Sequence, residues 1–158
     1  MNIQERIEAL EAEFNERLKA LKAEVQREDE FPQFGDDYWY VDSDAEVMDT
    51  ASYDGEYDQD RLSIGNVFKT KEQAQFVVEK LKVEAELRKY SRPFKEGENE
   101  NWFILWGTYK KEVQIDWSRK LVRQGTIYFE SRKKANEAVE SVGEERIKKY
   151  IFGVEDQL

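Results

Sequence analysis

The chain has 158 residues, of which 38% are charged and 13% aromatic, and its net charge at neutral pH is −10. It contains no cysteine and no histidine, which excludes disulfides, thiolate nucleophiles, Ser-His-Asp catalysis and zinc sites built from those residues. The length predicts one compact domain with an appendage. The first residues form no apolar signal segment, so we expect a cytoplasmic protein without a membrane span.

Residues 1–30 are predicted to form a long, coiled-coil-like helix that pairs with another helix. Apolar residues recur every three or four positions, with a mean step of about 3.67 residues, which is closer to an eleven-residue repeat than to a heptad. So narrow a stripe favours pairing with one helix over burial in a globular core. We expect the helix to end before Glu28 and to form a homodimer, with packing on its own domain or on a target as the alternatives. The predicted dimerisation residues are Ile3, Ile7, Leu10, Phe14, Leu18, Leu21 and Val25.

Residues 35–158 are predicted to form two tandem β-β-β-α units within one compact domain, the first over 35–92 and the second over 99–158. Alternating aromatic and β-branched residues indicate strands at 38–41, 46–50, 65–69, 101–106, 112–117 and 125–129. The connections are short, so the strands are expected to be antiparallel. The predicted fold class is α+β, with helices covering an antiparallel sheet.

The two units are predicted to be copies of one another. Phe68 and Thr70 precede one helix as Phe129 and Ser131 precede the other, at a constant spacing of 61 residues. The hydroxyls of Thr70 and Ser131 stand where an N-cap belongs. Each helix is therefore expected to begin directly after its hydroxyl residue.

Three segments carry distinctive motifs: residues 35–40 (GDDYWY), 65–74 (GNVFKTKEQA) and 143–150 (GEERIKKY). In them the chain resembles small acidic proteins of unknown function that are encoded by phages and prophages of Gram-positive bacteria. The resemblance covers roughly residues 35–153. It implies an accessory protein that acts on a host component, and it brings no active site with it. Such sequences tend to have Gly in the first hairpin turn, where this chain has Ala45.

Acidic residues are concentrated in residues 28–60, which hold 13 Asp or Glu and no Lys or Arg. A dense anionic field attracts cationic partners and repels long nucleic acid. We therefore expect a non-catalytic inhibitor that mimics nucleic acid and binds a basic surface of a host nucleic-acid-handling or defence protein, as anti-restriction and anti-CRISPR proteins do; a solubilising loop is the alternative. The expected contact residues are Asp36, Asp37, Asp42, Asp44, Glu46, Tyr53, Asp54, Glu56, Tyr57, Asp58 and Asp60.

A second hypothesis places a small nucleotide signal in a cleft between the two units. Aromatic rings stack on a base and basic side chains hold the phosphates in such sites. The residues concerned are Trp106, Lys110, Trp117, Arg119 and Arg123, and for the tryptophans the alternative is a place in the core. A third hypothesis is a structural scaffold that depends mainly on the N-terminal helix.

Catalysis and metal binding are not expected. The sequence has no phosphate-binding glycine motif and no nucleophile elbow, so we predict no enzymatic activity and no cofactor. Asp42, Asp44 and Glu46 resemble the start of a calcium loop, but Val47 and Tyr53 stand where that loop needs Gly and Glu. Asp54, Asp58 and Asp60 specify a cation site only weakly, so no metal is predicted.

Overall fold

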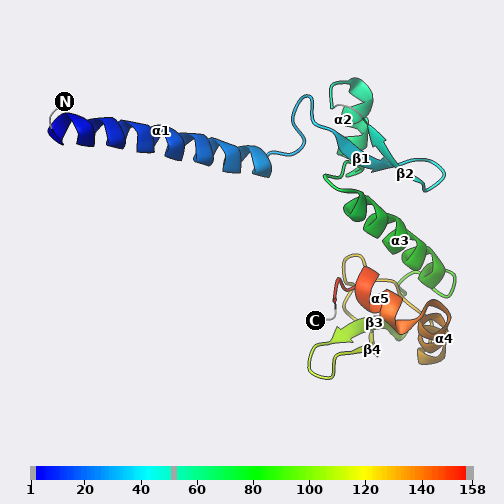
Figure 1. The fold of residues 1–158 in the computed structure, drawn as a ribbon. Coiled ribbons are helices and arrows are strands. Elements are labelled where there is room, and N and C mark those ends of the chain that lie inside the picture. The colour runs from blue at the N-terminus through cyan, green and yellow to red at the C-terminus, as the bar shows by residue number, and fades with distance from the viewer. Residues whose placement is uncertain (1–2, 51–52, 156–158) are drawn as a thin grey trace. The chain divides into compact units, whose positions relative to one another are not determined.

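The computed structural model describes residues 3–50 and 53–155, with the side chains of 26–29 outside the description. Its fold class is α+β, as predicted. The elements in chain order are α1 (Ile3–Asp29), β1 (Tyr38–Val41), β2 (Val47–Thr50), α2 (Glu56–Ser63), α3 (Lys71–Arg88), β3 (Asn101–Gly107), β4 (Glu112–Ser118), α4 (Arg132–Val142) and α5 (Glu144–Tyr150) (Figure 1). The chain divides into unit 1, Met1–Ala74, and unit 2, Gln75–Leu158. None of the described helices is long and apolar enough to cross a membrane.

Helix α1 is continuous over Ile3–Asp29, as the apolar periodicity predicted. It ends after Asp29 rather than before Glu28, because the first residue that disfavours helix is Phe31, which precedes Pro32. Glu13 and Arg17 form an ion pair of 3.0 Å one turn apart. Every residue of the predicted stripe is exposed, from 38% at Leu18 to 76% at Ile3.

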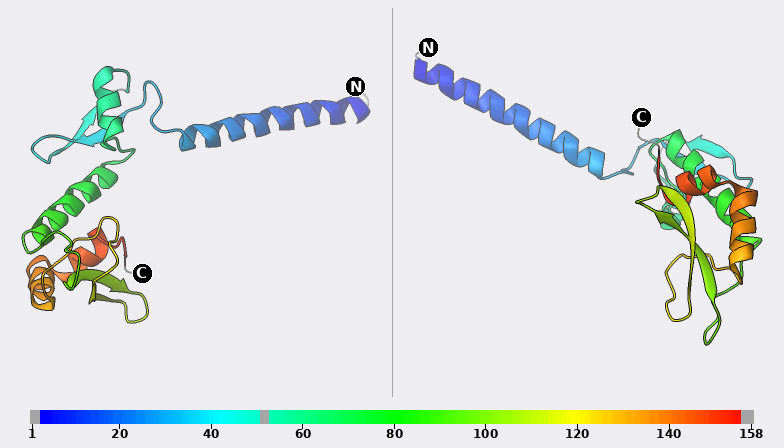
Figure 2. Two further views of the ribbon diagram at one scale, coloured as in Figure 1. Left: turned by 180° about the vertical axis from the view of Figure 1, so that it is seen from behind. Right: turned by 90° about the horizontal axis from the view of Figure 1, so that it is seen from below.

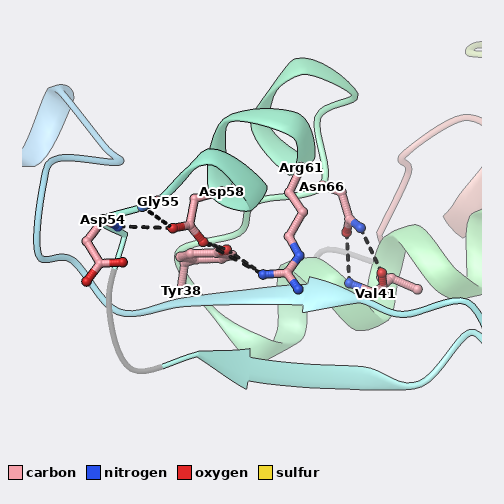
Figure 3. A network of polar contacts seen from close by, with 7 residues as sticks. All are labelled: Tyr38, Val41, Asp54, Gly55, Asp58, Arg61 and Asn66. Carbon is pink, nitrogen blue, oxygen red and sulfur yellow. Dashed lines mark hydrogen bonds and ion pairs between the residues drawn. The ribbon is translucent and has the colours of Figure 1, made fainter.

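The two-stranded sheet of unit 1 is an antiparallel hairpin in which Tyr38 lies opposite Thr50 and Val41 lies opposite Val47. The third strand predicted at 65–69 is wrong: only Phe68 pairs with Trp39, through two backbone hydrogen bonds of 2.8 Å. The side chain of Asn66 explains why. Its amide accepts from the Val41 N–H and donates to the Val41 carbonyl, at 2.8 and 2.7 Å (Figure 3), and so replaces the backbone of a third strand.

Helix α2 was not predicted; no helix or strand was expected between the strands at 46–50 and 65–69. Its first turn is stabilised by Asp58, whose Oδ2 accepts from the N–H groups of Gly55 and Asp54 at 2.7 and 3.0 Å. This is the reciprocal half of a capping box, in which a side chain at the third helical position binds the backbone before the helix. The acidic first turn also suits the positive end of the helix dipole.

Unit 2 is built on the β3–β4 hairpin, which runs from Asn101 opposite Ser118 to Gly107 opposite Glu112. One face of the hairpin packs with α4 and α5 (Figure 2). That face contributes Trp102, Ile104, Val113 and Ile115 to a core made of Val83, Leu87, Phe129, Ala135, Ala138, Val142 and Ile147.

The third strand predicted at 125–129 is also wrong. Phe129 forms a single bridge to Trp102, and the residues before it turn: the Thr126 N–H donates to the Arg123 carbonyl at 3.4 Å. The carbonyl of Tyr128 accepts from the Arg92 N–H at 2.9 Å rather than from a strand. The prediction of three-stranded units therefore reduces to two hairpins, each joined by one bridge to a later segment.

Both predicted N-caps are confirmed. Thr70 Oγ1 accepts from the Gln73 N–H at 3.2 Å before α3, and Gln73 Oε1 accepts in return from the Thr70 N–H at 3.3 Å. Ser131 Oγ accepts from the Lys134 N–H at 3.2 Å before α4. Gly143, with φ of +95°, separates α4 from α5.

Replacing Ala45 with Gly is expected to raise the free energy of unfolding of unit 1 by about 0.5–1 kcal/mol. Ala45 occupies the β1–β2 turn with φ of +63°, a conformation that disfavours residues with a Cβ. Urea unfolding of the full chain measures the change. The matched control is Ser43→Gly in the same turn, where φ is not positive and no gain is expected. A loss of stability in the Ala45 variant would contradict the argument.

Candidate protein-binding surface

A buried polar network holds α2 against β1 in unit 1 (Figure 3). Asp58 is only 7% exposed, and its Oδ1 accepts a hydrogen bond from the Tyr38 hydroxyl. Arg61 Nη1 donates to the same hydroxyl at 2.9 Å, and the Arg61 guanidinium lies 3.8 Å from the centre of the Tyr40 ring. Alternation along β1 places Tyr38 and Tyr40 on the same face, which is how both reach the helix.

The network is electrically balanced at neutral pH. The hydrogen bond from Tyr38 lowers the pKa of Asp58, with further help from the N–H groups of Gly55 and Asp54 and from Arg61. Burial, and then the bond to Asp58, raise the pKa of Tyr38. The bond to Tyr38 raises the pKa of Arg61. The negative charge of Asp58 therefore balances the positive charge of Arg61, with the neutral Tyr38 between them. Such an arrangement stabilises the fold.

Two residues expected on the contact surface lie in the interior instead. Asp58 belongs to the network, and Tyr53 is 9% exposed with its ring edge-on to Tyr38 at 6.1 Å. Backbone hydrogen bonds join Tyr53 to Gly35 and Asp36 at 2.8 and 2.7 Å. Both residues are thus parts of the scaffold, because each has a partner from a distant part of the chain.

Two further acidic residues shape loops. Asp36 is half-buried and its Oδ2 accepts from the Gln33 N–H at 2.8 Å. Asp42 is half-buried, and its Oδ1 accepts from the N–H groups of Asp44 and Glu46, both at 2.9 Å. These bonds fix the approach to β1 and the β1–β2 turn, and with it the positions of the exposed acids in that turn.

The remaining acidic side chains of residues 36–60 form what we call the acidic surface. Its members are exposed and come from the β1–β2 hairpin, α2 and the residues before them: Asp37, Asp44, Glu46, Asp49, Asp54, Glu56 and Asp60. Two aromatic residues of the same segment are also exposed, Tyr57 at 81% and Phe34 at 85%. Asp49 was not predicted as a contact residue, although its place opposite Trp39 in the hairpin follows from strand pairing.

Basic side chains leave the acidic surface unneutralised. Within the described part of unit 1, the ion pair formed by the acids of 36–60 is Asp58–Arg61, at 3.7 Å. Among residues 3–50 and 53–155, no group of three or more acidic side chains is placed to hold a metal ion. The exposed carboxylates are therefore spread over unit 1 as separate charges, an arrangement that suits a broad basic partner more than a single cation.

The residues of the second hypothesis all lie in unit 2. The Arg119 guanidinium lies over the Trp117 ring, 5.2 Å from its centre, but the two tryptophans are not brought together. Trp106 pairs with Val113 and Trp117 pairs with Trp102, four positions apart along β3, which is about 13 Å. Arg123 stacks on Phe103 at 4.6 Å, on the other face of the hairpin.

Two of the three basic side chains of that hypothesis, those of Lys110 and Arg119, also have acidic partners. Arg119 pairs with Glu100 and Glu98 at 3.4 and 3.7 Å, and Lys110 pairs with Glu112 at 3.9 Å. A pocket of about 150 Å³ in unit 2 is lined by other, mainly apolar residues, among them Leu87, Ile127 and Ile151. Ligand pockets of drug-sized molecules have volumes of roughly 300–1,000 Å³, so this pocket is smaller than a typical nucleotide site. Two larger pockets of unit 2, of about 520 and 300 Å³, lie beside Tyr150 and beside Tyr90, and the residues of the second hypothesis do not line them.

The chain was compared with known protein families, curated proteins and solved structures. No protein-family model, curated protein or solved structure matches the chain.

Proposed function

We propose that this chain is a non-catalytic binding protein whose acidic surface engages a basic face of a nucleic-acid-handling protein and blocks access of nucleic acid to it. The resemblance to phage proteins makes a host defence nuclease the expected class of target. The observation that carries the proposal is the internal pairing of Arg61 with Asp58. It engages the one basic side chain of α2 in an internal contact, and it holds the exposed carboxylates on a fixed hairpin and helix.

Fixed spacing matters because a mimic must place its charges where the phosphates of a nucleic acid would lie. Asp54, Glu56 and Asp60 are carried by or flank α2, which the Tyr38 network anchors to β1. Asp44 and Glu46 sit in a turn fixed by Asp42. Carboxylates held in this way can make charge-assisted hydrogen bonds to arginine forks without a large loss of conformational entropy.

The exposed aromatic residues complete the surface. Tyr57 lies on α2 between Glu56 and Asp58, and Phe34 lies on the approach to β1. Aromatic side chains are enriched at the centres of protein interfaces, where they bury large apolar areas. We infer that Tyr57 and Phe34 supply apolar contact beside the carboxylates. The carboxylates accelerate association with the basic partner and make it sensitive to salt.

Neutralising Asp54, Glu56 and Asp60 together, as Asp54→Asn, Glu56→Gln and Asp60→Asn, is expected to weaken partner binding about tenfold. The full chain serves as bait in lysate of a Gram-positive host, and the affinity of the captured protein is then measured against intact and altered chains. The expected partner binds nucleic acid, and its own nucleic acid competes with the intact chain. Added salt lowers the affinity of the intact chain more than that of the neutralised chain.

The matched control removes the same number of charges from unit 2, as Glu96→Gln, Glu140→Gln and Glu155→Gln, all at exposed positions. This control is expected to keep the affinity of the intact chain. Equal affinities of the partner for the neutralised and control chains, or failure of nucleic acid to compete, would refute the proposal.

A further inference from the structure

Helix α1 is built from an eleven-residue repeat. Residues 3–13 read IQERIEALEAE and residues 14–24 read FNERLKALKAE, so the apolar residues, the Glu-Arg pair and two alanines recur at the same places. Eleven residues make three turns at 3.67 residues per turn, close to the 3.6 of an unstrained helix. The apolar stripe therefore stays on one side of a nearly straight helix over its whole length.

Within residues 3–50 and 53–155, no other part of the chain covers the stripe. Its seven members are between 38% and 76% exposed. An uninterrupted row of large apolar side chains on an otherwise charged helix marks an interaction site. The spacing of the apolar stripe and the charges on its two flanks identify the helix that binds there.

The spacing of the stripe is the same in both directions. Phe14 lies at its centre, and Leu10 and Leu18, Ile7 and Leu21, and Ile3 and Val25 lie at equal distances on either side. Two copies that run antiparallel with Phe14 against Phe14 therefore set every apolar residue of one helix opposite an apolar residue of the other. A parallel pair in register does the same, so the charges decide between the two.

The two repeats differ in charge. Glu8 and Glu11 of the first repeat correspond to Lys19 and Lys22 of the second. Residues 3–13 carry four acidic residues and one basic residue, and residues 14–24 carry two acidic and three basic residues. A parallel pair would place the two acidic halves together, whereas an antiparallel pair places each acidic half against a basic half.

Helical geometry extends this comparison to individual residues. In the antiparallel pair, Glu8 and Glu11 of one helix fall within about 3 Å along the axis of Lys22 and Lys19 of the other. On the opposite flank, Arg6 and Arg17 face Glu24 and Glu13 in the same way. Each of these four pairs on the flanks of the stripe thus joins an acidic residue to a basic residue.

The parallel pair gives a mixed result. It sets Glu11 beside Glu13 and Lys19 beside Arg17, so that two of its four flanking contacts are repulsive. Like charges that face each other across a helix pair repel and so disfavour that alignment of the helices. We propose that α1 forms an antiparallel homodimer with α1 of a second copy of this chain, with the two-fold axis at Phe14.

The mass of the full chain in solution tests the pairing. Light scattering during size exclusion is expected to give twice the 18.8 kDa of one chain. Replacing Leu10 and Leu18 with Glu is expected to give one chain mass. The matched control, Ala12→Glu with Ala23→Glu, adds the same two charges on the opposite face of the helix and is expected to leave the dimer intact. A single-chain mass for the unaltered protein, or equal dissociation by both variants, would overturn the proposal.

Disulfide crosslinking tests the direction, because the chain has no cysteine of its own. Chains carrying Leu10→Cys and chains carrying Leu18→Cys are mixed and oxidised. The antiparallel pair predicts a disulfide between the two kinds of chain. It predicts none between two Leu10→Cys chains, whose cysteines are about 12 Å apart along the axis. Disulfides formed only between identical chains would show a parallel pair and overturn the proposal.

Discussion

Replacing Asp58 with Asn is expected to lower the free energy of unfolding of unit 1 by about 2–4 kcal/mol. The Asp58 carboxylate accepts from the Tyr38 hydroxyl and from the N–H groups of Asp54 and Gly55. An amide in the same place turns one acceptor into a donor and removes the negative charge that faces Arg61. The variant then leaves a buried donor without an acceptor and a cation without its counter-charge.

Hydrogen exchange measured by mass spectrometry assigns the loss to a unit. Peptides from β1, β2 and α2 are expected to exchange faster in the Asp58→Asn chain, and peptides from β3 and β4 are expected to keep the rates of the unaltered chain. The matched control is Asp60→Asn, an exposed carboxylate on the same helix. Its effect is expected to stay within about 0.5 kcal/mol. Equal effects of the two variants would show that the network does not stabilise unit 1.

The same substitution is expected to change the acid sensitivity of unit 1. The pKa of Asp58 is lower in the folded protein than its ordinary value, which is about 3.9 for an unfolded chain. Stability contributed by such a group is present above the unfolded pKa and is lost as the pH falls through the folded pKa. The stability difference between the unaltered and Asp58→Asn chains should therefore be constant near neutral pH and shrink below about pH 4.

Replacing Asn101 with Ala is expected to lower the free energy of unfolding of unit 2 by about 3 kcal/mol or more. Asn101 is fully buried, and its Oδ1 accepts from Arg92 Nη1 and from the Lys95 N–H, both at 2.8 Å. Its Nδ2 lies within hydrogen-bond distance of three carbonyl oxygens, those of Lys95, Asn99 and Ser118, at 2.9–3.2 Å. One side chain thus joins the 92–100 loop to both strands of the hairpin, and its removal leaves several buried polar groups unpaired.

Urea unfolding of the full chain, followed by hydrogen exchange of peptides around 92–101, measures this loss. The matched control is Asn99→Ala, because Asn99 is exposed and its side chain donates a single hydrogen bond, to the Glu96 carbonyl at 2.9 Å. The control is expected to change stability by about 0.5 kcal/mol or less. A loss at Asn101 no larger than at Asn99 would contradict the role given to this amide.

Local signals were sufficient for much of the fold. The periodicity from Ile3 to Val25 predicted α1, alternation predicted both hairpins, and the hydroxyls of Thr70 and Ser131 marked two helix starts. Each of these features depends on residues within a few positions of one another. A helix turn or a hairpin is fixed by neighbours in the sequence, so its pattern can be recognised without the rest of the chain.

The third strands and α2 were decided by partners far away in the sequence. Phe68 is a residue type that is common in strands. However, the side-chain amide of Asn66 binds the backbone of Val41, 25 positions away, and the pairing with β1 ends after one bridge. In the acidic segment, Asp58 organises a helix start and meets Tyr38, 20 positions away. Composition alone was compatible with a solvated loop there. It does not show which carboxylate accepts a hydrogen bond from a buried donor.

The sequence by itself determined that the acidic charge lies in residues 28–60, that no basic residue in that range balances it, and that α1 presents a repeating apolar stripe. Only the tertiary structure decided which acids face solvent. Tyr38, Gly55 and Arg61 hold Asp58 inside, while Asp49, Glu56 and Asp60 stay exposed. Burying a charge is favourable only where donors already converge on it, and that convergence exists only once strand and helix have packed.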